Sequence, residues 1–422
     1  MVKSFILSDR NIDRNSYIYN MIGSLLVAFQ SVILLMILTR VLGLVAAGIF
    51  TFAYANANLL LTVGRFGMRP FQASDVTNQF SFQEYRRSRW ITSGMTLLLS
   101  GGFVIVSTLI HTYDFEKSMI LLLMCIYKLA DGIEDVYYGQ YQQRGRLDIA
   151  GKALTIRLLS TIILFGGLLI FVGDLLWALL ITTIFTYSIL LLLLAWTHHL
   201  FTNVKRKIKN EKVFRLLKAC FPLFLGGFLS FLIGNLPRYA IDASLTYEIQ
   251  AIFGFIAMPV FVIGLLSGII FNPMIQKMSQ YWNQSDVKSF VKQATIQSII
   301  VVGLTLLSLV GAYFLGVPIL SLLYSTDLSA YRLELLILLL GGGFLGLSGL
   351  LHILITIIRR QAWILWSYGL VTVLALMITF PVVRKYGILG ASLLYLINMV
   401  LLCICLFAIL FIGIRNYRRN YC

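Results

Sequence analysis

The sequence predicts an all-α polytopic membrane protein of about 12 transmembrane helices in two six-helix lobes. The first observation is composition: 59% of the 422 residues are hydrophobic, and the mean hydropathy is +0.88. The second is a series of apolar runs of about 20 residues, the length that a helix needs to cross a bilayer. The third is that every second gap between runs is rich in Lys and Arg. Open strands would leave backbone groups unpaired in lipid, so the runs are helices.

Twelve apolar runs follow one another along the chain, separated by short polar gaps. They lie at residues 16–39, 44–64, 90–110, 118–141, 153–172, 174–197, 219–240, 247–271, 290–315, 331–357, 361–383 and 386–414. The gaps are too short to hold a second, soluble domain. Gly341 to Gly343 fall inside the tenth run, where small residues permit close helix packing.

The basic residues predict the orientation. Of the 34 Lys and Arg residues, we assign 27 to the side that holds the N-terminus, among them Arg86, Arg87, Arg89 and Arg157. Short loops rich in positive charge stay in the cytoplasm, so both termini are expected there. The formal net charge of +17 follows from this topology and suits anionic membrane lipids as partners. Nucleic acid is not expected as a partner.

The longest inner connector divides the chain into halves. We predict an N-terminal six-helix lobe at residues 1–200, a basic cytoplasmic linker at 201–218 and a C-terminal six-helix lobe at 219–422. Six spans per half start both halves on the same side, which favours a parallel repeat. Arg40 and Arg238 echo one another, because each lies at the outer end of the first span of its half.

The fourth run contains the densest set of charges: Lys128, Asp131, Glu134 and Asp135. Charge near the bilayer centre is costly, and the rise per residue places Lys128 about 15 Å into the membrane. Their spacing puts Lys128, Asp131 and Asp135 on one helix face, which must meet another helix or a hydrated cavity. Lys128 and Asp131 either neutralise each other or line a polar lumen. The surplus carboxylates favour water or a partner arginine from another span.

Arg40, Arg238, Lys128 and Arg65 are the candidate substrate-binding residues. Guanidinium groups in a central cavity suit a phosphate or pyrophosphate, which they bind through paired hydrogen bonds. The alternatives are snorkelling to the interface for Arg40 and Arg238, and an ordinary inner-loop role for Arg65. The candidates for ion coupling or charge pairing are Asp131, Glu134, Asp135 and Asp242. No histidine or cysteine spacing indicates a metal, and no glycine loop indicates a nucleotide, so we expect no metal and no cofactor.

Five segments carry a resemblance to a known family. They are GRFGMRPFQASD (64–75), YKLADGIEDVYYGQYQQRGRLDIAGK (127–152), LPRYAID (236–242), GIIFNPMIQKMSQYW (268–282) and ILLLGGGFLGLSGLLHILITIIRRQ (337–361). From about residue 15 to 412 the chain resembles the Wzx-type flippases of capsule, exopolysaccharide or O-antigen repeat units. These belong to the multidrug/oligosaccharidyl-lipid/polysaccharide exporter superfamily.

The resemblance implies a V-shaped transporter in the bacterial cytoplasmic (inner) membrane. It further implies that an undecaprenyl-pyrophosphate-linked oligosaccharide crosses by alternating access of a central cavity. Relatives that carry such lipids have cationic cavities, and Arg40 and Arg238 match their basic positions, with Lys128 joining them. A coupling cation and a polysaccharide polymerase are candidate partners. The acidic cluster of the fourth run departs from a purely cationic lumen, so Asp131 and Asp135 either neutralise basic residues or bind the coupling cation.

Three further functions are weighed against this one. A lipid II flippase and a cation-coupled multidrug exporter are the alternatives among transporters. The first span lacks the acidic residue that drug exporters of the superfamily use for cation binding. A membrane polysaccharide polymerase or ligase is the alternative from another class, but the outer loops are short and contain no acid/base pair or activated nucleophile. We therefore expect a protein that is not an enzyme.

Overall fold

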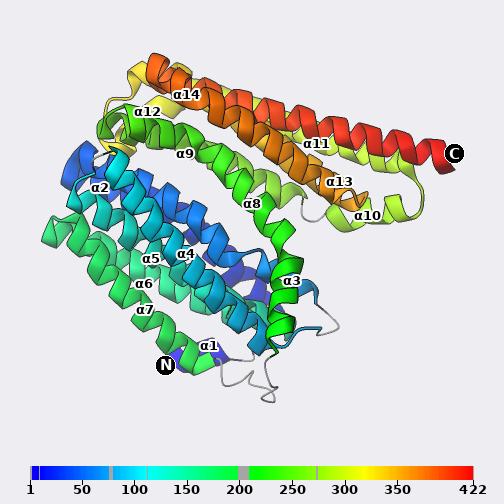
Figure 1. Ribbon diagram of the computed structural model, residues 1–422, viewed down its shortest axis with the longest axis horizontal. Helices are drawn as coiled ribbons and strands as arrows, with labels where there is room; N and C mark the ends of the chain where they lie inside the picture. Colours follow the sequence, from blue (N-terminus) through cyan, green and yellow to red (C-terminus); the bar gives the residue numbers. More distant parts are fainter. Residues whose placement is uncertain are drawn as a thin grey trace. The chain divides into compact units, whose positions relative to one another are not determined.

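The computed structural model describes residues 2–8, 10–75, 79–111, 113–197, 209–271 and 274–421, and these residues form helices joined by short loops (Figure 1). The first helices are α1 (Val2–Leu7), α2 (Ile12–Arg65), α3 (Met68–Ser74), α4 (Phe82–His111), α5 (Phe115–Gln143), α6 (Leu147–Val172) and α7 (Leu175–Thr197). They are followed by α8 (Asn210–Ser244), α9 (Tyr247–Phe271), α10 (Ile275–Asn283), α11 (Val287–Gly311), α12 (Val317–Tyr324), α13 (Arg332–Ile357) and α14 (Gln361–Tyr421). No strand occurs within these described ranges.

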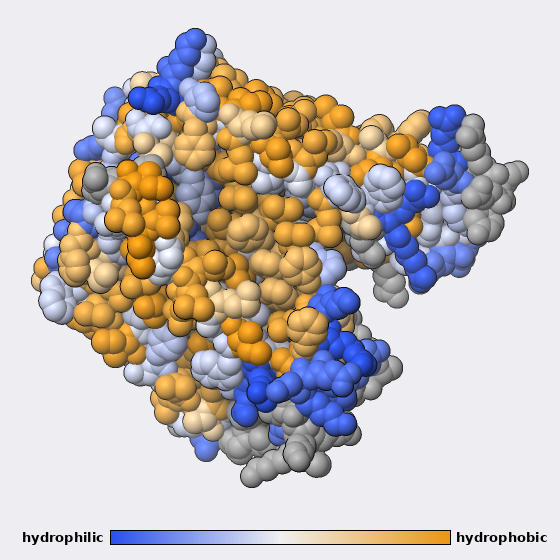
Figure 2. Space-filling model, viewed as in Figure 1, coloured by the Kyte–Doolittle hydropathy of each residue, from blue (hydrophilic) through white to orange (hydrophobic). Residues whose placement is uncertain are grey.

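About twelve membrane spans are present, as the sequence predicts. Among the described residues, nine helical segments are long and apolar enough to cross a membrane. Two of them, α2 and α14, each contain two spans, because the helix is interrupted at Gly43 and at Gly387. α5 is also long enough to cross a membrane, although its charged residues make it less apolar than these nine segments. Large apolar side chains cover much of the molecular surface, as expected for helices that face lipid (Figure 2).

The two interruptions depend on glycine. Gly43 has φ 83° and ψ −172°, and Gly387 has φ 59° and ψ −137°. A side chain at these angles would clash with the residue's own backbone, although nothing else lies within 4 Å of either position. Glycine therefore permits the chain to leave one helix and enter the next without a loop.

The ninth span is longer than predicted. α11 passes into a π-helical turn at Ala312–Gly316 and then into α12, so the helical segment ends at Tyr324 and not near residue 315. Pro318 does not stop it, because it lies in the first turn of α12, where a missing N–H group is tolerated.

The chain forms two compact units, Met1–Phe228 (unit 1) and Leu229–Cys422 (unit 2), and the boundary lies inside α8. In unit 1, α2 packs along α5 and α6, and α5 also packs against α4 and α7. Our predicted limits for the lobes and the linker stay a prediction. Residues 201–208 of the linker lie outside the described residues, and residues 210–218 form the first turns of α8.

In unit 2, α13 is the central helix and packs against α9, α11 and α14. Its three consecutive glycines each face a different neighbour: Gly341 faces Tyr395 of α14, Gly342 faces Val260 of α9, and Gly343 faces Thr305 of α11. A β-carbon at any of these glycines would come within 3.0 Å of the neighbour. The prediction that this glycine run serves close helix packing is confirmed.

Candidate functional site

The four charged side chains in the middle of α5 are buried in unit 1. Lys128 is 2% exposed, Asp131 6%, Glu134 3% and Asp135 7%. None of them faces lipid, in agreement with the spacing argument. The four side chains do not share one environment, however, because each contacts partners from a different set of helices.

Arg157 of α6 joins two of the carboxylates. Its Nη2 atom lies 2.7 Å from Asp131 Oδ1 and 2.6 Å from Glu134 Oε1, and its Nε donates to Glu134 Oε2 at 2.7 Å. Two parallel hydrogen bonds to Glu134 give the bidentate geometry that makes arginine–carboxylate pairs strong. The Tyr138 hydroxyl donates to Glu134 Oε2 at 3.1 Å and completes the shell of that carboxylate.

Lys128 provides a second cation for Asp131. Its Nζ lies 2.5 Å from Asp131 Oδ2 and also donates to Gln30 Oε1 of α2 at 3.5 Å. The same ammonium group lies 5.1 Å from the centre of the Tyr54 ring, within the range of a cation–π contact. Lys128 is therefore held between α5 and α2 by one carboxylate, one amide and one aromatic ring.

Asp135 is bound by two arginines from other helices. Arg89 of α4 lies 3.0 Å from Asp135 Oδ2, and Arg69 of α3 lies 3.5 Å from Oδ1. Arg89 is buried and also donates to the carbonyl of Gly64 near the end of α2. A buried carboxylate and a buried guanidinium would each be costly alone, so this pair ties α4 to α5 and α2.

A cavity of about 210 Å³ opens beside these pairs. It is lined by Ser24, Val27, Arg65, Arg69, Asp131, Glu134, Asp135, Tyr138 and Leu154. Arg65 is exposed, and within the described part of the chain it lies more than 4 Å from every carboxylate. The whole cluster contains five basic groups (Arg65, Arg69, Arg89, Lys128 and Arg157) and three acidic groups (Asp131, Glu134 and Asp135). Its formal charge is thus positive, although α5 alone would make it negative.

The other predicted residues lie elsewhere. Arg40 is exposed on α2, three residues before the interruption at Gly43, and does not line the cavity. Arg238 belongs to unit 2 and is half-buried on α8, where its Nη1 donates to Asn235 Oδ1 at 2.7 Å. Asp242 is half-buried one turn further along α8. The structure thus brings Arg65, Lys128 and three carboxylates together, whereas the roles of all these residues stay predictions.

Sequence reasoning counted Arg89 and Arg157 among the basic residues of the side that holds the N-terminus and gave neither of them a partner. Both are buried inside helices and paired with the carboxylates of α5. A signal was present for Arg157, because it falls inside the apolar run at 153–172. The surplus of acidic groups in the fourth run also required a partner arginine from another span, but not a particular one.

Solved structures show which fold the chain has. The fold is similar to that of the lipid II flippase MurJ in an inward closed conformation, with a TM-score of 0.72 and 14% identity over 94% of this chain and 86% of that one. It is also similar to an inward-facing multidrug resistance MATE family transporter of the MOP superfamily, with a TM-score of 0.66 and 14% identity over 94% and 96% of the two chains. The predicted all-α transporter fold is confirmed.

Residues 14–278 match the model of the polysaccharide biosynthesis protein family, and the chain belongs to that family. The capsular polysaccharide biosynthesis protein CapF of Staphylococcus aureus is 24% identical over 316 residues, which are 74% of this chain and 78% of the relative. The resemblance to polysaccharide flippases is therefore confirmed. The chain is a multi-pass protein of the bacterial cytoplasmic membrane, as predicted, while the cytoplasmic position of both termini stays a prediction.

Proposed function

We propose that the protein flips undecaprenyl-pyrophosphate-linked oligosaccharide repeat units across the cytoplasmic membrane for surface polysaccharide biosynthesis. The observation that carries the proposal is the cationic balance of the unit 1 cavity. Its carboxylates already have buried cations as partners, namely Lys128, Arg89 and Arg157. The guanidinium group of Arg65 on the cavity wall is therefore available to an anion, and Arg69 beside it shares its carboxylate with Arg89.

Arg69 and Arg65 differ in how readily they would bind a pyrophosphate. Arg69 shares Asp135 with Arg89, and its 3.5 Å contact is the longer of the two. An entering phosphate could replace this contact without leaving Asp135 unpaired. Arg65 makes no ion pair within the described residues and can present its planar donors directly.

The acidic residues of the cavity would bind a coupling cation during the transport cycle. Flipping by alternating access needs a site that is exposed first on one side and then on the other. A coupling cation that reached Asp131 would compete with Lys128, which lies 2.5 Å away. Displacement of Lys128 from Asp131 would also disturb the contacts of its ammonium group with Gln30 and Tyr54 of α2, which gives a physical route from ion binding to a change in helix packing. Under this proposal the protein performs no covalent chemistry, so it is not an enzyme.

Complementation tests the proposal. The chain is expressed in a bacterial strain that lacks its own capsule repeat-unit flippase, and surface polysaccharide is measured beside the amount of protein in the membrane. We expect the double variant Arg65→Gln/Arg69→Gln to abolish polysaccharide at unchanged protein abundance. Arg215→Gln is the matched control, since Arg215 is an exposed arginine of α8 that pairs with exposed Glu211. Normal polysaccharide in the double variant would exclude the cavity as the substrate site.

A lipid II flippase is the second candidate, and the fold similarity to MurJ supports it. Rescue of cells depleted of their lipid II flippase, without rescue of the capsule-flippase deletion, would assign the protein to that function. A cation-coupled multidrug exporter would instead raise resistance across a drug panel. The spans of α2 contain no acidic residue after Asp13, which argues against the exporter.

A further inference from the structure

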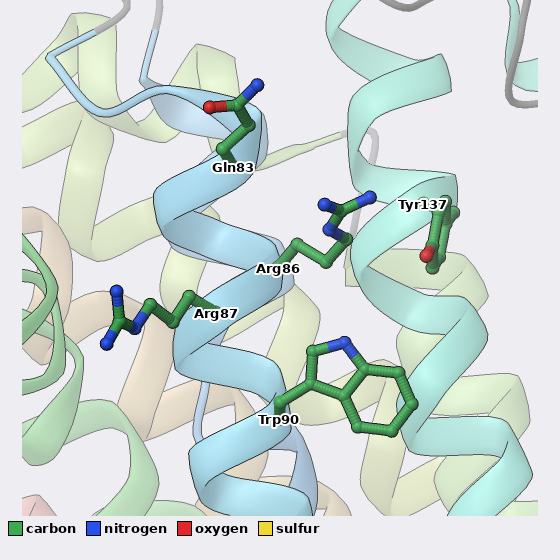
Figure 3. A pocket seen from close by; sticks show the side chains of 5 residues that line it. All are labelled: Gln83, Arg86, Arg87, Trp90 and Tyr137. Carbon is green, nitrogen blue, oxygen red and sulfur yellow. The ribbon is translucent and has the colours of Figure 1, made fainter. Parts of the chain in front are cut away.

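A second pocket, of about 330 Å³, lies on unit 1 between α4 and α5 and is separate from the cavity described above. It is lined by Gln83, Arg86, Arg87, Trp90 and Tyr137 (Figure 3). The first four follow the spacing i, i+3, i+4 and i+7, which places them on one face of α4. Tyr137 of α5 closes the pocket on one side, and Arg86 extends toward it.

The two arginines of this pocket differ from their neighbour Arg89. Arg89 points into the unit, where it is buried and paired with Asp135. Arg86 is half-buried and Arg87 is exposed, and among the residues that the structure describes neither lies within 4 Å of a carboxylate. Two guanidinium groups, which extend to opposite sides of α4 in Figure 3, line the pocket together with an amide and an indole N–H. These groups donate hydrogen bonds, and none of the five lining residues is acidic, which is the chemistry of an anion site.

The position of the pocket along α4 indicates that the anion comes from a membrane lipid. Trp90 is 58% exposed and stands where the polar start of the helix meets its apolar part, as tryptophan does at membrane interfaces. Beyond it the same helix face continues with Gly94, Leu97, Leu98 and Gly101. Leu98 is 78% exposed, and nothing lies within 4 Å of a β-carbon placed on either glycine. A polar pocket therefore runs directly into a shallow, open apolar strip.

We propose that this pocket binds the phosphate headgroup of an anionic glycerophospholipid of the surrounding bilayer, with an acyl chain along the adjoining strip of α4. A free phosphate would use the pocket but not the strip. The inference does not depend on the transported substrate, because none of the pocket residues lines the cavity that contains Arg65 and Arg69.

Native mass spectrometry of the full-length protein in detergent tests this site with phosphatidylglycerol as the probe. The double variant Arg86→Gln/Arg87→Gln should weaken binding of the first phosphatidylglycerol roughly tenfold, because each basic residue near the surface adds to the attraction of anionic lipid. The control Lys288→Gln/Lys292→Gln removes two exposed charges from α11 and should change binding little. The single variant Arg87→Gln, which alters only an exposed side chain, should reproduce part of the loss if the double variant is unstable.

Three results would overturn the proposal. One is equal phosphatidylglycerol affinity in the parent and in both pocket variants. Another is displacement of the bound lipid by inorganic phosphate alone, which would mark a site for free phosphate. The third is a pocket that accepts undecaprenyl phosphate but not phosphatidylglycerol, which would make it a substrate site. Phosphatidylcholine, which has the same chains and no net charge, should bind the parent and the double variant equally.

Discussion

The two units differ in whether their buried or half-buried basic side chains are paired with carboxylates. In unit 1, Lys128, Arg89 and Arg157 are almost fully buried, and each touches a carboxylate of α5. In unit 2, Arg238 is half-buried on α8, yet no carboxylate lies within 4 Å of it among the described residues. Its contacts are the Asn235 amide oxygen and the Phe253 ring, 5.8 Å away, and its Nε has no hydrogen-bond partner there.

This difference separates charges that hold helices together from charges that are free to bind. A buried ion pair contributes little net stability over an apolar core, but removal of one partner is costly because the other charge is left uncompensated. Unit 1 should therefore be sensitive to single substitutions in its core. Arg238 leaves no carboxylate unpaired when it is replaced, so its loss should affect anion binding more than folding.

The largest effect is expected from Arg157→Gln. The substitution leaves Glu134 without both guanidinium contacts and Asp131 with Lys128 alone, and uncompensated buried charges of this kind cost about 3–5 kcal/mol. The thermal unfolding midpoint in detergent should fall strongly, together with the yield of monodisperse protein. The double variant Arg157→Gln/Glu134→Gln should recover part of the loss. An unchanged midpoint in the single variant would mean that this network does not stabilise unit 1.

The sequence predicted the helices well and the partners of the charges poorly, for a physical reason. Apolar runs of bilayer length are local properties, so the spans and even the packing role of the Gly341–Gly343 run could be read from composition. The interruption at Gly43 falls in the predicted gap between runs, and the one at Gly387 lies two residues after the predicted gap at 384–385. Which cation meets which carboxylate depends on how helices rotate against each other, and no local pattern encodes that rotation.

Arg89 shows the limit most clearly. It is one of three arginines within four positions, and all three match the pattern of basic inner loops. The helical turn sends Arg89 toward Asp135 and leaves Arg86 and Arg87 on the face that carries the second pocket. Only the rotation of α4 against α5 distinguishes Arg89 from the other two. A polar cavity could therefore be expected from the charges of α5, but the excess of basic over acidic groups around it could not.

Lys128→Met should have a smaller effect than Arg157→Gln. Asp131 keeps its 2.7 Å contact with Arg157, so the substitution removes one of two cations, and we expect a loss of about 1–3 kcal/mol. The midpoint of thermal unfolding measures the difference between the two variants under the same conditions. If Lys128→Met proved the more destabilising, Arg157 would not be the main stabilising cation of this network.

Arg238→Gln tests the basic residue of unit 2 that has no carboxylate partner among the described residues. Stability should change by less than about 1 kcal/mol, since no buried carboxylate loses a partner. Surface polysaccharide in the complementation strain should nevertheless fall, because the variant removes a cation that the sequence predicts for substrate binding. Membrane abundance and thermal midpoint are measured on the same preparations. A variant that unfolds readily but still supports polysaccharide in proportion to its abundance would assign Arg238 a structural role.

The smallest effect concerns a partly exposed carboxylate that is stabilised mainly by hydrogen bonds. Asp286 precedes α11, and its Oδ1 accepts a hydrogen bond from the Ser289 N–H at 2.9 Å. Hydrogen bonding by Ser289, which favours the ionised form, lowers the pKa of Asp286 below its ordinary value of 3.8. Because the folded-state pKa is the lower one, the cap stabilises the helix fully above the unfolded-state pKa and is lost as pH falls through the folded-state pKa.

Amide hydrogen exchange at the start of α11 measures this loss. Protection of residues 287–290, corrected for intrinsic exchange rates, should weaken in that acidic window. Asp286→Asn should remove the pH dependence while keeping the cap, because an asparagine side chain accepts the same hydrogen bond and does not titrate. Persistence of the same pH dependence in Asp286→Asn would show that another group controls the start of α11.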